Sequence, residues 1–205
     1  MDKETHLVAP GRPREFDTNQ ALDRAIRQFS AHGFHGTSIS DLNKALGLTT
    51  GSIYKAWGDK RGLLLAALER YIELRTEEIA RVTANTSDGL AKIAAVLRFY
   101  AELSSSTEGK IGCLVVEMAV ELSVSEADIA KRLSRQESSR RAQFEGWVEE
   151  AVMDGSISQQ TDIKSCAELL QALTQGMRVL GKTGASSERM LAIADQAVSM
   201  LASSN

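Results

Sequence analysis

The sequence has 205 residues and a formal net charge of −3, with two cysteines and two prolines. That length accommodates one small and one larger domain. Cys113 and Cys166 are too few and too far apart for a disulfide framework or a zinc site, so we expect no metal, no cofactor and a reducing cytoplasm. The longest apolar stretch, residues 63–68, is about a third of a membrane span, and we expect neither export nor membrane anchoring.

The residues after Arg14 predict an all-α fold. Both prolines, Pro10 and Pro13, precede this point, and the residues that follow favour helix without alternating runs of strand type. We expect about nine helices, arranged as a three-helix N-terminal head and a larger helical body. Residues 1–75 hold 11 Lys and Arg against 9 Asp and Glu, whereas the rest hold 13 against 18. This asymmetry permits a DNA-binding head without establishing one.

Residues 1–14 form a polar tail that we expect to be a flexible, basic arm. A first helix follows, with Asp17 or Thr18 as its N-cap and Gly33 as its end. Its buried face is predicted by apolar residues at helical spacing: Ala21, Leu22, Ala25, Ile26 and Phe29.

A capping box predicts the start of the second helix, because Ser38 is followed three residues later by Asp41. Gly47 ends it. A short third helix follows, capped by Thr49 or Thr50 and ended by Gly58.

The third helix is predicted to bury one face and expose the others. Ile53 and Trp57 share the buried face. The remaining faces carry hydroxyls, a methyl group and a cation, which suit base edges, thymine methyls and phosphates; they come from Thr50, Ser52, Tyr54 and Lys55.

A long helix over residues 60–83 then leads away from the head. Five amphipathic stretches follow, at residues 90–104, 111–123, 126–153, 162–181 and 187–202. We therefore divide the chain into an arm (1–14), a helix-turn-helix domain (15–60), a connecting helix (61–84) and a ligand-binding and dimerisation domain (85–205).

Residues 37–68 have the layout of a helix-turn-helix, in which the second helix enters the major groove. Together with the first helix and its Gly33-Phe34 end, this segment resembles the N-terminal signature of the TetR family of transcriptional regulators. The resemblance covers residues 16 to about 70. It implies a homodimeric, DNA-binding regulator, in which residues 90–153 enclose a small-molecule pocket and residues 162–202 form the dimer bundle.

The resemblance also implies roles for individual residues. Thr37 and Ser38 would cap the second helix and touch phosphate, Tyr54 would contact backbone and base, and Lys60 would pair with phosphate. The start of the recognition helix would be formed by Thr49, Thr50, Gly51 and Ser52. Arg12 and Arg14 resemble a basic arm that enters the minor groove, although a plain solvated tail explains them equally well.

The two C-terminal stretches support a dimer bundle independently of the resemblance. Their apolar stripes are wider than one helix pair can hide: Leu169, Leu170, Leu173, Met177 and Leu180, then Met190, Ile193, Ala194, Ala197, Val198 and Leu201.

The body offers candidate ligand contacts that favour a hydrophobic or aromatic effector. Arg98 and Glu117 are the expected polar anchors, although every candidate could instead belong to the core. The apolar or amphipathic candidates are Phe99, Tyr100, Met118, Phe144, Trp147 and Met177.

Cys113 stands at the start of the 111–123 helix, where the helix dipole favours the thiolate and its reaction with electrophiles or oxidants. The Gly112-Cys113-Leu114 run resembles one found in a subset of the family. The alternative is a small buried apolar residue.

The function predicted from these features is a repressor that leaves a palindromic operator when a small hydrophobic or reactive effector binds. Two other classes remain open. An enzyme is disfavoured because all three histidines, His6, His32 and His35, lie in the tail or the head, which leaves only carboxylate chemistry and no predicted catalytic residue. A helical adaptor with a vestigial helix-turn-helix is the other alternative.

Overall fold

The computed structural model describes residues 16–202, and every regular element among them is an α-helix. The expected all-α fold is confirmed. The helices are α1 (Thr18–His32), α2 (Ile39–Leu46), α3 (Thr50–Trp57), α4 (Lys60–Thr83), α5 (Gly89–Ser105), α6 (Thr107–Ile111), α7 (Leu114–Leu122), α8 (Ala127–Met153), α9 (Ile163–Lys182) and α10 (Ser187–Ala202). The expected arm, including Arg12 and Arg14, lies outside the described residues, and no helix within them is long and apolar enough to cross a membrane.

The helix beyond the expected nine is α6, which lies between the predicted stretches 90–104 and 111–123. Ser106 caps it by accepting hydrogen bonds from the backbone N–H groups of Glu108 and Gly109. Gly109 also lies so close to Ser104 that an added Cβ would fall 1.8 Å from the Ser104 carbonyl oxygen. Glycine at this position therefore allows close packing of α6 against the end of α5.

The turns of the head follow the local chemistry that the sequence predicted. Asp17 caps α1, Ser38 and Asp41 form the capping box of α2, and Thr49 caps α3. Hydrogen bonds from the hydroxyl and the backbone N–H of Ser38 hold the pKa of the Asp41 carboxyl below its usual value. Gly47 ends α2 in the left-handed conformation at φ 70°, which glycine adopts without strain.

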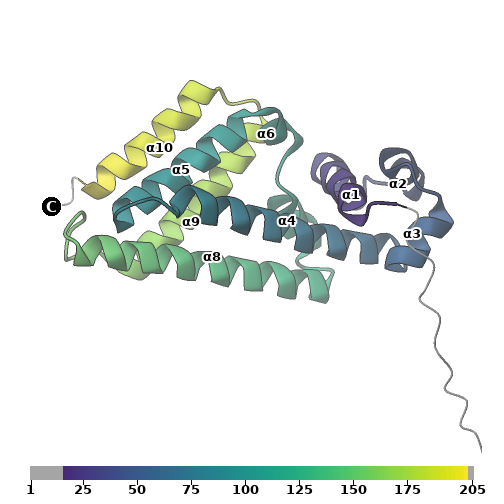
Figure 1. Cartoon of the computed structure of the whole chain (residues 1–205), viewed down its shortest axis with the longest axis horizontal. Coiled ribbons are helices and arrows are strands. Elements are labelled where there is room, and N and C mark those ends of the chain that lie inside the picture. Colours follow the sequence, from purple (N-terminus) through teal and green to yellow (C-terminus); the bar gives the residue numbers. More distant parts are fainter. Residues whose placement is uncertain (1–15, 203–205) are drawn as a thin grey trace, which may run out of the picture.

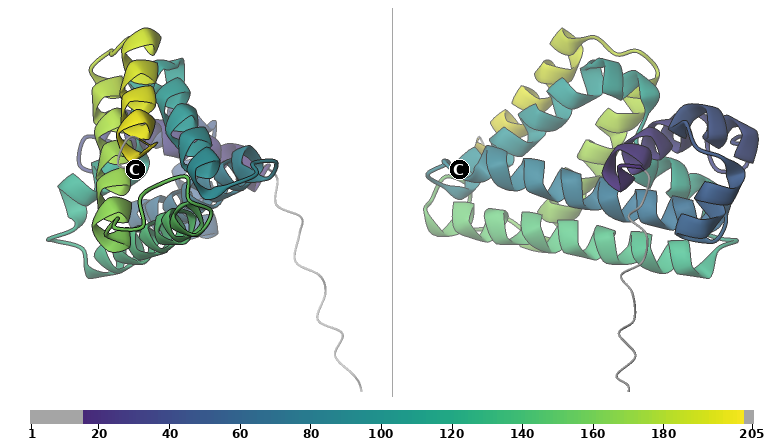
Figure 2. Two further views of the ribbon diagram at one scale, coloured as in Figure 1. Left: turned by 90° about the vertical axis from the view of Figure 1, so that its left-hand side faces the viewer. Right: turned by 45° about the vertical axis from the view of Figure 1, so that its right-hand side comes forward.

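Helix α4 joins the two parts of the molecule. Figure 1 shows it running from the three-helix head into the body, with α8 alongside it. Ion pairs connect these two helices: Arg61 with Glu126 and Asp128, and Arg132 with Glu69. The head therefore lies at one end of this helix pair, and the C-terminus of α10 lies at the far side of the body (Figures 1 and 2).

The head shares its hydrophobic core with the body. Leu42, Ile53 and Phe29 are fully buried, and the same cluster continues through Leu114 and Met118 of α7. A second cluster fills the body around Phe144 and Trp147, whose rings meet edge to face with centroids 5.5 Å apart. Helix α7 therefore packs against the head as well as belonging to the body. The predicted domain boundaries stay predictions.

Candidate nucleic-acid interface and effector pocket

The outer face of α3 is polar and accessible. Ile53 is fully buried and anchors the helix, while Tyr54 is 44% exposed and Lys55 and Gly51 are exposed as well. An eight-residue helix is unstable alone, so this anchoring is what fixes the exposed face.

One side-chain hydrogen bond joins α2 to α3, and a second caps α3. The Asn43 amide donates to the Thr50 hydroxyl at 2.9 Å, and the Thr49 hydroxyl accepts from the Ser52 backbone N–H at 3.2 Å. Thr49 is exposed, whereas Thr50 and Ser52 are partly exposed. Ser38, the N-cap of α2, is exposed and stays a predicted DNA contact.

Thr37 does not have the predicted environment. Its side chain is fully buried, and its hydroxyl donates to the Gly33 carbonyl oxygen at 2.7 Å. The structure thus contradicts a surface contact between Thr37 and phosphate. The hydroxyl instead closes the turn between α1 and α2. Thr37 and Ser38 are adjacent and chemically alike, so the sequence could not show that one is buried and the other exposed.

Lys60, which is predicted to pair with phosphate, has partners within the head. Its ammonium donates to the carbonyl oxygens of Phe34 and Thr37, both at 2.9 Å, and lies 4.1 Å from the centroid of the Phe34 ring. Two of its three donors are used within the head. Lys60 therefore holds the turn before α2 through these two donors, and its pairing with phosphate stays a prediction.

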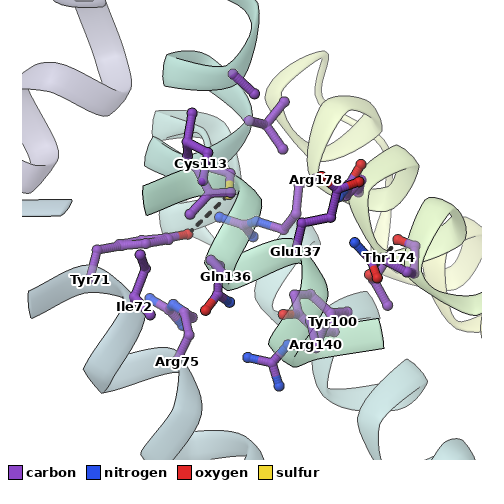
Figure 3. Close-up of a pocket in the computed structure, with 16 residues that line it drawn as sticks. Tyr71, Ile72, Arg75, Tyr100, Cys113, Gln136, Glu137, Arg140, Thr174 and Arg178 are labelled. Atoms are coloured by element: carbon purple, nitrogen blue, oxygen red, sulfur yellow. Dashed lines mark hydrogen bonds between the residues drawn. The ribbon is translucent and has the colours of Figure 1, made fainter. Parts of the chain in front are cut away.

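A pocket of about 170 Å³ lies where α4, α5, α7, α8 and α9 meet. Figure 3 shows side chains from these helices directed into one space. Its lining is mixed: apolar residues such as Val115, Val116 and Leu133 form part of the wall, and polar or charged groups form the rest.

Of the nine predicted ligand contacts, Tyr100 and Cys113 line this pocket and the other seven do not. Two kinds of contact account for the positions of these seven residues. Arg98 and Glu117 are engaged in ion pairs elsewhere, with Asp195 and Lys182 respectively. The remaining apolar candidates pack into the two cores: Phe99, Met118, Phe144, Trp147 and Met177.

Sequence reasoning missed the polar lining, above all Arg75, Arg140 and Arg178. A usable signal existed in α9, where Gln171, Thr174 and Arg178 recur at helical spacing. All three are buried. Polar residues on a face that should be apolar mark a cavity with something polar to bind.

Cys113 occupies the N-cap position of α7, as expected for the start of a helix, and it is a partly exposed free thiol. The Tyr71 hydroxyl donates to its sulfur at 3.3 Å, the contact drawn in Figure 3. Burial raises the pKa of Tyr71 well above its usual value, so this hydroxyl stays protonated and remains a donor. The thiol thus faces the pocket while touching α4.

Helix α7 is tied to the head at its other end. The Glu121 carboxylate accepts from the backbone N–H groups of Phe34 and His35 at 2.7 and 2.6 Å. A second tie comes from Lys182 of α9, which donates to Glu117 at 2.6 Å and to the Ser30 carbonyl oxygen at 3.3 Å. The segment from Cys113 to Glu121 therefore connects the pocket with the turn before α2.

An apolar groove of about 960 Å³ lies along α9 and α10. The predicted stripes are divided between its surface and the core: Leu170 and Met190 are buried inward, whereas Leu169 is 63% exposed. Leu173, Ile193 and Ala197 line the groove. A contiguous apolar surface of this kind is typical of a protein interface.

Two family models match the chain. Residues 21–67 match the model described as bacterial regulatory proteins, tetR family, and residues 89–198 match a tetracyclin repressor-like C-terminal domain. The second match alone spans more than half of the chain, and together they cover the head and the body.

Individual proteins match over nearly the whole length. The chain is 29% identical to the transcriptional repressor ComR of Escherichia coli (strain K12), over 90% of this chain and 88% of ComR. It is 27% identical to the regulator YezE of Bacillus subtilis (strain 168), over 93% of this chain and 99% of YezE. Among solved structures, a cysteine mutant of the TetR family regulator CifR, complexed with 26-base-pair operator DNA, aligns with a TM-score of 0.83 and 28% identity, covering 93% of this chain and all of that one.

Proposed function

Since the chain belongs to the TetR family of DNA-binding transcriptional regulators, which are not enzymes, we propose that it is a repressor released from its operator by an effector. In this proposal a homodimer binds an imperfect palindrome, and a small molecule in the pocket, or a reaction at Cys113, ends the binding. ComR and CifR support it as a repressor and as a protein crystallised on operator DNA.

The observation that carries the proposal is the exposed polar face of α3. Ile53 fixes the helix from below, and Ser52, Tyr54 and Lys55 are left on accessible surface. A hydroxyl, a phenol and an ammonium in this arrangement suit base edges and phosphates in a major groove. Ser38 at the cap of α2 would add a phosphate contact.

Dimerisation is supported by the groove along α9 and α10. Leu169 is largely exposed in the single chain, and the surrounding groove is apolar. Covering this surface with a second copy removes apolar area from water at about 25 cal/mol per Å². Two-fold symmetry would then present two α3 helices about 34–36 Å apart, one turn of DNA.

We propose that a displacement of α7 couples the pocket to the DNA-binding helices. Cys113 at its start faces the pocket, and Glu121 at its end holds the turn before α2. A molecule in the pocket, or a group added to the Cys113 sulfur, would displace α7 and with it the orientation of α2 and α3.

The proposal is tested with DNA from upstream of the protein's own gene. A fluorescently labelled fragment and a shuffled fragment of the same composition are titrated with the intact protein at fixed salt. We expect the upstream fragment to bind at least about 10³-fold more tightly than the shuffled one. Equal binding of both would contradict a repressor role, and no binding to either would favour the adaptor alternative.

A further inference from the structure

Three guanidinium groups from three different helices converge on the effector pocket. Arg75 comes from α4, Arg140 from α8 and Arg178 from α9, and Figure 3 shows them around the same space. Their exposures are 8%, 7% and 2%. Burying an arginine is costly because its guanidinium stays charged at any pH a protein encounters.

One of the three charges is neutralised by the protein. Arg75 forms ion pairs with Glu78 at 2.6 Å and with Glu108. This arginine is therefore part of a complete ion-pair network, apart from its Nε atom, which has no hydrogen-bond partner in the described part of the chain.

The other two charges have neutral partners. Arg178 donates to the Gly112 carbonyl oxygen at 3.0 Å and to the Ser104 hydroxyl at 3.4 Å, and its buried Nε has no partner among residues 16–202. Arg140 donates to the Gln143 side chain at 2.6 Å. Within residues 16–202 neither has a carboxylate within ion-pair distance, so two buried positive charges lack a counter-charge.

The remaining groups around the pocket fit an acceptor-rich guest. Tyr100 offers a hydroxyl whose pKa is raised by burial, which keeps it protonated as a donor, whereas the Tyr71 hydroxyl already donates to Cys113. Glu137 is the one carboxylate among the lining residues, and it is exposed at the margin. The Gln171 side-chain oxygen is buried without a partner in the described part of the chain, which leaves it able to accept from a donor on the guest.

The size and the apolar wall limit what the guest can be. A cavity of about 150 Å³ holds benzene, and this pocket measures about 170 Å³. Val115, Val116 and Leu133 supply a surface for an apolar body.

We propose that the pocket binds a small organic carboxylate, with its anionic group between Arg140 and Arg178 and a short apolar body against α7 and α8. Planar guanidinium groups match the two oxygens of a carboxylate, which is why arginine pairs recognise this group well. The inference names the class of effector for the pocket, and its regulatory meaning rests on the proposed repressor function. A carboxylate with an aromatic or hydrophobic body would agree both with the effector expected from the sequence and with the cationic lining of the pocket.

The test uses three planar probes that differ in charge. Benzoate, neutral benzamide and cationic benzamidine are added separately at millimolar concentration to the full-length protein without DNA. Binding is measured by titration calorimetry and by the thermal midpoint of unfolding. We expect benzoate to bind and to raise the midpoint, and benzamide and benzamidine to bind at least tenfold more weakly.

Variants locate the binding. Arg140→Gln and Arg178→Gln should each weaken benzoate at least tenfold, and Arg140→Lys should recover part of the loss. Arg141→Gln is the matched control, because Arg141 is the next residue on α8 and faces Glu145 instead of the pocket. Arg140→Gln removes a buried unpaired charge, so we expect this variant to fold.

The outcomes separate this inference from the repressor proposal. Equal binding of benzoate and benzamide, or benzoate binding unchanged by both arginine variants, overturns it, as does the absence of any benzoate binding. If Cys113→Ala alone abolished benzoate binding while Arg140→Gln did not, the thiol and not the arginines would define the site. Because DNA is absent, failure here leaves operator binding intact, and failure of operator binding leaves a benzoate result standing.

Discussion

The carboxylate of Glu121 accepts a hydrogen bond of 2.6 Å from the backbone N–H of His35, 86 residues earlier in the chain. It also accepts one from Phe34, so a single side chain of α7 holds the turn that orients α2. Gly33 lies beside it at a φ of 72°, a backbone conformation that favours glycine. Helix α7 thus joins the pocket to the DNA-binding head through the hydrogen bonds of a single side chain, which can be substituted.

Glu121→Gln should uncouple release from modification of the pocket. The amide keeps one acceptor oxygen and replaces the other with a donor that faces a backbone N–H, so one of the two hydrogen bonds is lost at a cost of about 1–3 kcal/mol, and α7 holds the turn less tightly. We expect operator affinity to change less than tenfold, while release by N-ethylmaleimide becomes weaker than in wild type. The measurement is operator binding by fluorescence anisotropy before and after treatment, with thiol modification quantified by mass spectrometry. Glu149→Gln, at an exposed position on α8, is the control; full release of both variants would argue against the link.

Cys113→Ser should abolish release by an electrophile. N-ethylmaleimide forms a carbon–sulfur bond with the thiol, whose proton passes to the adjacent ring carbon, and the bulky product occupies the pocket beside Tyr71. Wild type and Cys166→Ser should leave the operator on treatment, whereas Cys113→Ser should stay bound. Cys166 is a suitable control because its thiol is 8% exposed and burial raises its pKa. Release of Cys113→Ser to the wild-type extent would remove Cys113 from the account.

Leu169→Glu should convert the dimer into a monomer. The side chain is 63% exposed in the single chain and lines the groove along α9 and α10, so a carboxylate there would be buried without a partner in the dimer. Analytical ultracentrifugation at micromolar concentration should show a dimer for wild type and a monomer for the variant, with unchanged helical circular dichroism. Val124→Glu, at a fully exposed position away from the groove, should remain dimeric. A monomeric wild type would refute the proposed interface.

Lys60→Met should lower the free energy of unfolding. The substitution removes two hydrogen bonds from the ammonium to backbone carbonyls and its contact with the Phe34 ring. We expect a loss of about 1–3 kcal/mol in the free energy of unfolding by urea. Lys55→Met, on the exposed face of α3, should change it by less than about 0.5 kcal/mol. Equal free energies of unfolding for the two variants would show that Lys60 does not stabilise the head.

Substitutions on α3 should separate affinity from sequence preference. Lys55→Ala should weaken specific and random DNA alike and reduce the slope of log affinity against log salt by about 2 per dimer, one phosphate contact for each subunit. Ser52→Ala should instead alter base preference by about 1–3 kcal/mol at one position of each half-site, with the slope nearly unchanged. Binding isotherms at several salt concentrations check both, and the reverse pattern would displace α3 from the groove.

The head could be predicted from the sequence because its determinants are local. The capping box of Ser38 and Asp41 and the stop at Gly47 depend on residues a few positions apart, and both are present in the structure. Thr37 and Lys60 show the limit, because their partners are backbone carbonyls of a turn whose path is set by the packed head.

The pocket could not be predicted in the same way because its walls come from distant helices. Arg75, Arg140 and Arg178 are each unremarkable charged residues until the fold brings them together. Large apolar residues such as Phe144 and Met118 were attractive candidates, yet they fill the cores, where most apolar surface is buried. A polar residue at an apolar register position, as at Arg178 and Gln171, is the more informative sign.

The most direct test of the central claim is selection of binding sites from a random double-stranded DNA library by the intact protein. The account predicts enrichment of an imperfect palindrome with half-sites about one helical turn apart, bound by one dimer. Ser52→Ala should select the same spacing with an altered base in each half-site. Recovery of sequences with no common motif, or of a motif without two-fold symmetry, would contradict an operator-binding dimer that reads DNA through α3.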